Sequence, residues 1–314
     1  MLIATYNGEA FIKKQLESIK NQTLSPKEVI ICDDCSTDKT VEIVQTFIVN
    51  NQLSNWKIVH NTENLGHYGT FLKLAILAEG KHIFFSDQDD IWSLEKIELM
   101  DAVLRESENS MVFCQSRFID ENDVVTSSQK ISGTCYEVDF QEMLTTWPSG
   151  YQMAVKKQFL NDVIVNRYHE LPGFDYHDVL FGMLSPVYGK VVKLDRVLDS
   201  HRIHHNNATI SSTTRSFSNS KKSRVTYLKK VRERYKSVQT ILLDRNQEFF
   251  KQIIDRNIDF IEIRIKFLQK RKLRDLVFLL QNQHLYGRKK DLISDVLYGY
   301  ALNGIIKWFI NFRK

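Results

Sequence analysis

The first 90 residues alternate short apolar runs with amphipathic stretches, and this order restricts the fold more than any other feature. Apolar runs predict strands within residues 1–7, 29–34, 56–61 and 82–87. Between them, apolar residues recur at helical spacing in residues 8–22, 36–50 and 69–80, with Ser36 expected as a helix N-cap. Strands and helices that alternate with short connections predict a mostly parallel, Rossmann-like sheet flanked by helices.

The remainder of the chain differs from this α/β body in charge. The 314 residues suffice for one α/β domain of about 200 residues and an appendage. The net charge is only +5, yet from Thr213 onward lysine and arginine outnumber aspartate and glutamate by more than two to one. We therefore expect two parts, an acidic α/β domain over residues 1–212 and a basic helical region over residues 213–314.

Acidic residues gather where two predicted strands end. Asp33 and Asp34 follow the second strand, and Asp87, Asp89 and Asp90 follow the fourth. Ligands of open α/β sheets bind outside the carboxyl ends of the strands, so these groups should face one mouth. No glycine-rich phosphate loop is present, but carboxylates that hold Mg²⁺ or Mn²⁺ can neutralise a nucleotide diphosphate instead. A solvated acidic turn that caps the next helix is the alternative for this cluster taken alone.

Cys32 and Cys35 have the spacing of a redox pair or half of a zinc site. A second pair and nearby histidine ligands are missing, so we favour small residues that flank a loop. Neither alternative is excluded by the spacing itself.

The motifs "ATYNGEAFIKKQLESIKNQT", "EVIICDDCSTDKT", "NLG" and "SDQDDIW", in this order, closely resemble family 2 glycosyltransferases with the GT-A fold. They are most similar to bacterial members that build surface polysaccharides, including rhamnosyltransferases, and the resemblance extends over about 210 residues. It implies an inverting, metal-dependent transfer of a sugar from a UDP- or dTDP-linked donor, with dTDP-rhamnose as one candidate, to a hydroxyl of a growing, lipid-linked polysaccharide.

The same resemblance implies roles for residues around the donor. Tyr6 and Glu9 would border the nucleoside, and Asp34 would accept a hydrogen bond from the base. Asp89 would bind Mg²⁺ or Mn²⁺, and Asp87 would contact the ribose or the metal.

Later motifs imply the rest of the site. Asp90 would lie near the donor sugar, and Trp147 and Gly150 would lie on the acceptor side. Asp178, in a segment that resembles the family's "HDW" motif, would be the catalytic base; Asp175 competes with it if the segment is helical throughout.

A histidine-rich stretch follows the predicted base. By position His204 would be a metal ligand, and Arg202 a donor-binding partner for phosphate. We expect His201 and His205 to be bystanders.

The basic region predicts helices at residues 225–244, 249–272 and 273–283, and its end, residues 300–314, mixes apolar with basic side chains. This composition suits contact with an anionic membrane surface. No leader peptide or membrane span is recognisable, so we expect a cytoplasmic protein, peripheral on the inner face of the bacterial plasma membrane. Packing on the catalytic domain, or on a second subunit as a homodimer, is the alternative. No motif supports nucleic-acid binding.

Two rival functions come from other classes. A sugar nucleotidyltransferase would need a basic, glycine-rich first loop, which "ATYNGEA" lacks. A catalytically degenerate scaffold for polysaccharide assembly would not need the intact aspartates. Met1 lies close to Tyr6, so the first strand is short and we expect a few residues to precede it.

Overall fold

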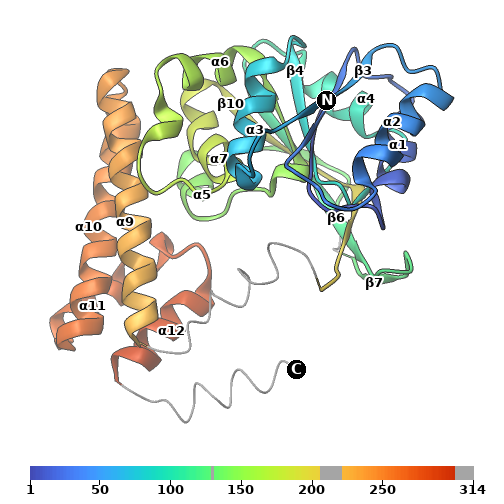
Figure 1. The fold of residues 1–314 in the computed structure, drawn as a ribbon. Helices are drawn as coiled ribbons and strands as arrows, with labels where there is room; N and C mark the ends of the chain where they lie inside the picture. Colours follow the sequence, from blue (N-terminus) through green and yellow to red (C-terminus); the bar gives the residue numbers. More distant parts are fainter. Residues whose placement is uncertain (129–130, 206–220, 301–314) are drawn as a thin grey trace. The chain divides into compact units, whose positions relative to one another are not determined.

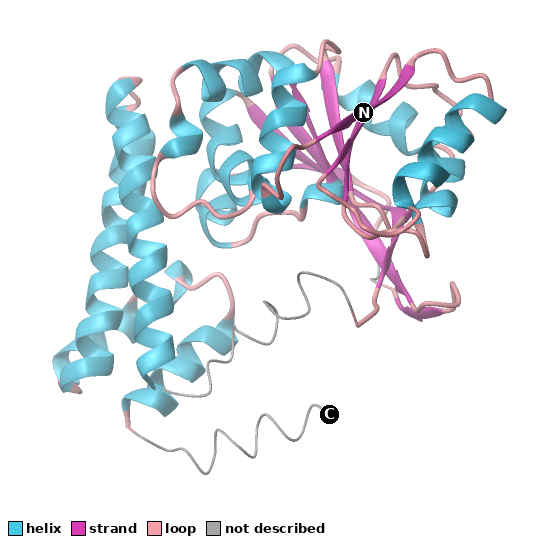
Figure 2. Cartoon of the chain, in the orientation of Figure 1, coloured by secondary structure: helices cyan, strands magenta, loops and turns pink. Residues whose placement is uncertain are grey.

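The computed structural model describes residues 1–128, 131–205 and 221–300 (Figure 1). The chain forms two compact units, each built from separated segments. The first contains residues 1–139, 147–169 and 175–205, and the second contains residues 140–146 and 170–174 with the C-terminal helices. Figure 2 shows that the strands gather in the first unit, whereas the second is helical.

Half of the sheet in the first unit is parallel, as the sequence predicts. Its strands run in the order β3-β2-β1-β4, and each pairs in parallel with its neighbour. Their bounds are β1 Leu2–Thr5, β2 Val29–Asp33, β3 Trp56–His60 and β4 His82–Ser86. All four therefore end at one edge of the sheet, where the acidic residues follow β2 and β4.

The other half of the sheet is mixed and brings a distant segment to the same edge. β9 lies between β4 and β6 and is antiparallel to both, whereas β6 and β10 are parallel. The short β5 pairs with the end of β10, with Asp199 opposite Trp92 and Ser200 opposite Ile91. This places residues 200–204 beside the acidic segment that precedes β5. The bounds are β5 Ile91–Trp92, β6 Asn109–Ile119, β7 Val125–Ser127, β8 Cys135–Val138, β9 Met153–Lys156 and β10 Lys190–Arg202.

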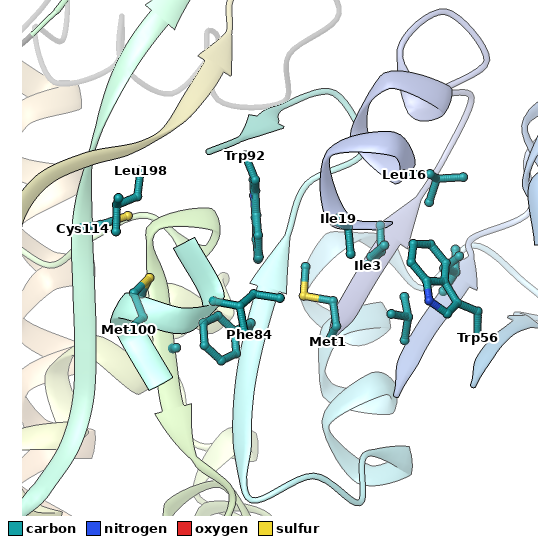
Figure 3. Packing of buried hydrophobic residues seen from close by; sticks show 14 of the residues in the cluster. Met1, Ile3, Leu16, Ile19, Trp56, Phe84, Trp92, Met100, Cys114 and Leu198 are labelled. Carbon is teal, nitrogen blue, oxygen red and sulfur yellow. The ribbon is translucent and has the colours of Figure 1, made fainter. Parts of the chain in front are cut away.

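Apolar faces of the helices cover this sheet. Ile12, Leu16 and Ile19, whose spacing predicts a helix, are fully buried on α1, and Figure 3 shows Leu16 and Ile19 in the core cluster with Trp92. The helices are α1 Ile12–Lys20, α2 Thr40–Asn50, α3 Gly66–Leu77, α4 Lys96–Leu104, α6 Lys157–Val165 and α7 His177–Tyr188, with short 3-10 turns η1 Gly150–Gln152 and η2 Tyr168–Glu170.

Ser36 does not cap α2, contrary to expectation. The helix begins at Thr40 after Lys39, and the Ser36 hydroxyl instead donates to Asp33 Oδ1 at 2.5 Å. The two cysteines nearby are free thiols; Cys32 is buried, and its Sγ lies 3.3 Å from Asn61 Oδ1. These contacts agree with packing beside a loop.

The second unit contains the predicted helices of the basic region and buries an ionic cluster. The carboxylate of Asp295 accepts hydrogen bonds from Arg224 Nε at 2.9 Å, Arg264 Nε at 2.6 Å and Tyr286 Oη at 2.9 Å. None of the helices in the described part of the chain combines the length and apolarity that a membrane crossing requires. Residues 301–314 lie outside the described residues. The helices are α5 Phe140–Thr145, α9 Lys221–Asp244, α10 Glu248–Lys270, α11 Leu273–Gln281 and α12 Lys289–Gly299, with the 3-10 turn η4 Gln283–Leu285.

Candidate active site

One glutamine ties the turn after β1 to the acidic segment after β4. The backbone N–H of Tyr6 donates to Gln88 Oε1 at 2.9 Å, and Gln88 Nε2 donates to the Tyr6 carbonyl at 3.0 Å. Gly8 packs against this amide, and a side chain there would displace the Gln88 amide from its position. Tyr6 is 49% exposed, and the exposed Glu9 accepts a hydrogen bond from the backbone N–H of Lys39. The two residues predicted to border the nucleoside therefore lie at the rim of this edge.

Asp34 is buried, and its carboxylate organises the loop before α3. Oδ1 accepts hydrogen bonds from Asn61 Nδ2 at 2.7 Å and from the Leu65 N–H at 2.8 Å, while Oδ2 accepts one from the Gly66 N–H at 2.8 Å. Gly66 adopts φ +69°, a conformation that favours glycine. A carboxylate offers about four acceptor positions, so these bonds leave room for about one more. Its hydrogen bond to a base stays a prediction.

Each of the three carboxylates after β4 faces a histidine. The nitrogen to oxygen distances are 3.4 Å from His67 to Asp87, 2.7 Å from His204 to Asp89 and 2.8 Å from His201 to Asp90. Pairing of β5 with β10 explains two of these contacts, and α3 supplies the third histidine. The expectation that His201 is a bystander is therefore wrong, and the sequence analysis missed His67. Spacing alone gives no signal for contacts between residues so far apart in the chain.

Asp90 is the most deeply buried of these carboxylates, with no exposed surface. Its Oδ1 accepts hydrogen bonds from His201 and from the Arg202 N–H at 3.2 Å, whereas Oδ2 has no hydrogen-bond partner among the described residues. Burial raises the pKa of Asp90 to about 7 against the opposing effect of His201. Burial alone would lower the pKa of His201, but the Asp90 carboxylate outweighs it and raises that pKa to about 9.

The carboxylate and imidazole groups fit a divalent cation. Asp87, Asp90 and His201 each offer one ligand atom, and these atoms lie within 4.8 Å of one another. Carboxylate oxygens suit Mg²⁺ and Mn²⁺, and Oδ2 of Asp90 is a buried acceptor to which no group in the described part of the chain donates. Of the expected ligands, Asp87 belongs to this group. Asp89 and His204 bond each other instead, and their role as ligands stays a prediction.

Asp178 lies in the first turn of α7, where its Oδ1 accepts a hydrogen bond from the Val179 N–H at 2.7 Å. Burial lowers the pKa of His67, but the bond to Asp87 and the charges of Asp87 and Asp178 outweigh burial and raise it. Asp178 is thus within electrostatic reach of the acidic cluster. Asp175 is exposed and precedes the helix, so the helical face that the two aspartates would have shared is absent.

Gly150 packs against the buried imidazole of His177, which any side chain at that position would overlap. The His177 ring lies 4.2 Å from the ring of Phe71 and 4.9 Å from that of Phe85, measured between centroids. Burial, and then the neighbouring His67, hold the pKa of His177 well below its usual range. The structure thus gives Gly150 a packing reason, and its place on the acceptor side stays a prediction.

The segment after Gly150 is anchored to the acidic cluster. Tyr151 stacks face to face on His201, with ring centroids 4.3 Å apart and an interplanar angle of 4°. Buried Lys96 donates to the Tyr151 carbonyl at 2.6 Å and to Asp199 Oδ2 at 2.7 Å. Trp147, expected on the acceptor side, is half-buried and lies three residues before Gly150.

Arg202 is fully buried, and its guanidinium contacts groups of the protein itself. Its Nε donates to the Asp89 carbonyl at 2.9 Å, Nη1 donates to the Asp120 carbonyl at 2.8 Å, and Nη2 lies 2.6 Å from Asp123 Oδ1. The guanidinium also stacks over the ring of Phe11, at 4.6 Å from its centroid. These contacts indicate that Arg202 positions the backbone of Asp89, and its predicted contact with phosphate would require it to leave them.

The sequence is similar to known glycosyltransferases over part of its length. The model of glycosyl transferase family 2 matches residues 1–167. The dTDP-rhamnosyl transferase RfbG of Shigella flexneri is 38% identical over 103 residues, which cover 31% of this chain and 34% of RfbG. The poly(ribitol-phosphate) beta-N-acetylglucosaminyltransferase TarS of Staphylococcus aureus is 31% identical over 134 residues, which cover 41% of this chain and 23% of TarS. The chain thus spans about a third and a quarter of the lengths of these relatives.

A solved structure shares the fold. The crystal structure of S. aureus TarS 1-349 in complex with UDP matches with a TM-score of 0.58 at 20% sequence identity, over 96% of this chain and 90% of that chain. This match confirms the predicted α/β fold of the GT-A type, with helices after the sheet. Because the family model covers more than half of its residues, the chain belongs to glycosyl transferase family 2.

Proposed function

We propose that this protein transfers a sugar from a nucleoside diphosphate donor to a hydroxyl group, with inversion at the anomeric carbon. The observation that carries the proposal is the set of three carboxylates after β4, in which one buried oxygen of Asp90 finds no donor among the residues that the structure describes. Such a group of carboxylates attracts a divalent cation, and the bound cation can also balance the negative charge of a diphosphate. The names of the relatives support this donor class, since RfbG is called a dTDP-rhamnosyl transferase and TarS has been crystallised with UDP-GlcNAc.

In this proposal the donor lies along the edge where β1, β2 and β4 end. Tyr6, Glu9 and Asp34 border the nucleoside, and the donor base is uracil or thymine. Mg²⁺ or Mn²⁺ is held by Asp87 and Asp90 with His201, and the pair of Asp89 and His204 completes the ligands or orients them. When bound, the cation stabilises the negative charge that develops on the leaving diphosphate.

Asp178 is the general base of the proposed reaction. Its carboxylate removes the proton of the acceptor hydroxyl as the oxygen forms a bond to the anomeric carbon and the bond to the diphosphate breaks. Nucleoside diphosphate leaves, and the proton stays on Asp178 until solvent accepts it. One base suffices, because inversion requires no covalent intermediate. Trp147 and Gly150 lie on the acceptor side in this scheme.

We further propose that the acceptor is a lipid-linked saccharide of a cell-surface polysaccharide. A supporting observation is the name of a relative, the UDP-Glc:alpha-D-GlcNAc-diphosphoundecaprenol beta-1,3-glucosyltransferase WfgD of Escherichia coli, which is 29% identical over 135 residues. Residues 1–212 would form the catalytic domain. Residues 213–314 would hold the protein peripherally on the inner face of the plasma membrane, and the same helices could join two copies.

The test is a panel of UDP-, dTDP- and GDP-sugars, assayed for binding and slow hydrolysis with and without Mn²⁺. We expect one donor to turn over only with the metal. Asp178→Asn should lower donor turnover about 10²- to 10⁴-fold while donor binding remains, and Asp89→Ala should weaken both. Asp101→Asn is the matched control, because Asp101 also faces a histidine, His82 at 2.6 Å, but at the opposite end of β4. Absence of binding by every donor would contradict the proposal and favour the scaffold.

A further inference from the structure

One face of α11 is packed and the opposite face is apolar and open. Leu279 is buried, and Leu276 and Phe278 are half-buried against the core cluster that contains Phe260 and Phe267 of α10. These contacts account for one side of the helix. They leave the other side to solvent.

The open side carries three large aliphatic residues at positions i, i+4 and i+7. Leu273 is 69% exposed, Val277 is 44% exposed and Leu280 is 46% exposed, and this spacing aligns them along the helix. We call these three residues the α11 apolar face. A surface helix normally presents polar side chains on its solvent side, so this face indicates a partner.

Exposed basic residues border the α11 apolar face. Lys270, Arg271, Lys272 and Arg274 lie at the corner between α10 and α11, where Arg271 adopts a left-handed conformation with φ 54°. Lys272 and Arg274 stand at the N-terminal end of α11, where the helix dipole disfavours positive charge. The stability of α11 therefore does not explain them.

Acidic residues that could neutralise this border are scarce. Asp275 is the one acidic residue between Lys270 and Lys290 in the sequence, and its side chain is 12% exposed and 3.4 Å from Arg274 Nε. A second copy that presented the same surface would bring basic and apolar groups but no exposed carboxylate. The charge therefore favours an anionic partner over self-association.

We propose that the α11 apolar face docks on an anionic lipid bilayer, with its three aliphatic side chains inserted among the lipids and the four basic residues on the headgroups. Aliphatic anchors beside lysine and arginine are the composition that binds such an interface. This inference deepens the proposed function and rests on it for the setting, a lipid-linked acceptor. It assigns the contact to a helix of the second unit.

Vesicle sedimentation tests the proposal with the full chain. The probes are vesicles of phosphatidylglycerol mixed with phosphatidylcholine, and vesicles of phosphatidylcholine alone. We expect the wild type to bind the anionic vesicles, and the triple variant Leu273→Gln, Val277→Gln, Leu280→Gln to bind them at least about tenfold more weakly. A second variant, Lys272→Gln with Arg274→Gln, should also weaken binding and leaves the aliphatic residues in place.

The matched control replaces three exposed aliphatic residues of the first unit, Val49→Gln, Ile76→Gln and Val165→Gln, which are 72%, 60% and 78% exposed. It should bind as the wild type does. Equal binding by the wild type and both α11 variants would overturn the proposal, as would absence of wild-type binding. Self-association that the triple variant abolishes, without vesicle binding, would assign the face to a second copy. Donor hydrolysis in solution should be the same in all variants, so a failure of the catalytic proposal is detected separately.

Discussion

Two buried carboxylates of this chain, Asp90 and Asp295, have opposite surroundings. Asp295, in the second unit, is bonded to Arg224, Arg264 and Tyr286, and despite its burial the two arginines hold its pKa below the usual range. Asp90, in the first unit, is bonded to His201 and one backbone N–H, and burial raises its pKa to about 7. Both are fully buried.

The difference separates a structural carboxylate from one that is prepared for a ligand. The Asp295 cluster has two cationic side chains for its charge and is complete within the protein. The acidic cluster after β4 has three carboxylates that face histidines, and one of its buried oxygens has no donor within residues 1–128, 131–205 and 221–300. A protein tolerates such an incomplete cluster where a cation or a substrate completes it.

The largest expected effect concerns the complete cluster. Asp295→Asn should lower the free energy of unfolding of the second unit by about 3–5 kcal/mol, because buried Arg264 loses its partner charge and Arg224 keeps only the longer contact with Asp291. Chemical denaturation, followed by hydrogen exchange of α9, α10 and α12, measures it. Asp255→Asn is the control: Asp255 pairs with Lys251 at 3.2 Å but is 38% exposed, so its loss should cost less than about 1 kcal/mol. Equal losses of unfolding free energy in Asp295→Asn and Asp255→Asn would contradict a special stabilising role of the Asp295 cluster.

Asp90→Asn should affect donor turnover more than the free energy of unfolding. Asparagine keeps the shape of the side chain, and His201, unlike the arginines beside Asp295, can lose its proton when the carboxylate is removed, so we expect the free energy of unfolding to fall by less than for Asp295→Asn. Metal-dependent donor turnover should fall at least about a hundredfold, since a ligand is lost. Full turnover in a stably folded Asp90→Asn variant would show that the reaction does not require the Asp90 carboxylate.

Addition of a cation should distinguish the two units directly. Mn²⁺ at about a hundred times its dissociation constant should stabilise the region that binds it by about 2.7 kcal/mol. Hydrogen exchange should slow in β4 and the end of β10 and stay unchanged in α12. Protection in both units, or in neither, would disagree with a cation site in the acidic cluster.

The smallest expected effect is a pH dependence of the Asp295 cluster. Because the folded state lowers the pKa of Asp295, its stabilising contribution is present above the unfolded pKa of about 4 and is lost as pH falls through the lower folded value. The difference in unfolding free energy between the wild type and Asp295→Asn should stay constant from about pH 5 to 8 and shrink below about pH 4. A difference that grew on acidification would have the wrong sign.

Local pattern predicted much of the fold. The β-branched run of β2 and the spacing of Ile12, Leu16 and Ile19 gave the correct strand and helix, because these elements bury a face set by their own sequence. The family motifs predicted the carboxylates at the strand ends. In both cases the information lies within about twenty residues of chain.

Contacts between distant segments could not be read from the sequence. His67 and His201 became partners of Asp87 and Asp90 only through the position of α3 and the pairing of β5 with β10. The charge of Arg202 suggested a phosphate ligand. In the structure its buried guanidinium contacts the carbonyls of Asp89 and Asp120 and the carboxylate of Asp123. Residue type predicts what a side chain can bind, whereas burial decides which partner it meets.

The central claim is that the acidic cluster after β4 holds a divalent cation for a nucleoside diphosphate. Calorimetric titration of Mn²⁺ in the presence of UDP or dTDP, with the wild type, Asp90→Asn and Asp101→Asn, tests it most directly. We expect one Mn²⁺ site in the wild type and in Asp101→Asn, and binding at least about tenfold weaker in Asp90→Asn. Equal Mn²⁺ affinity in all three proteins, or no binding by the wild type, would contradict it.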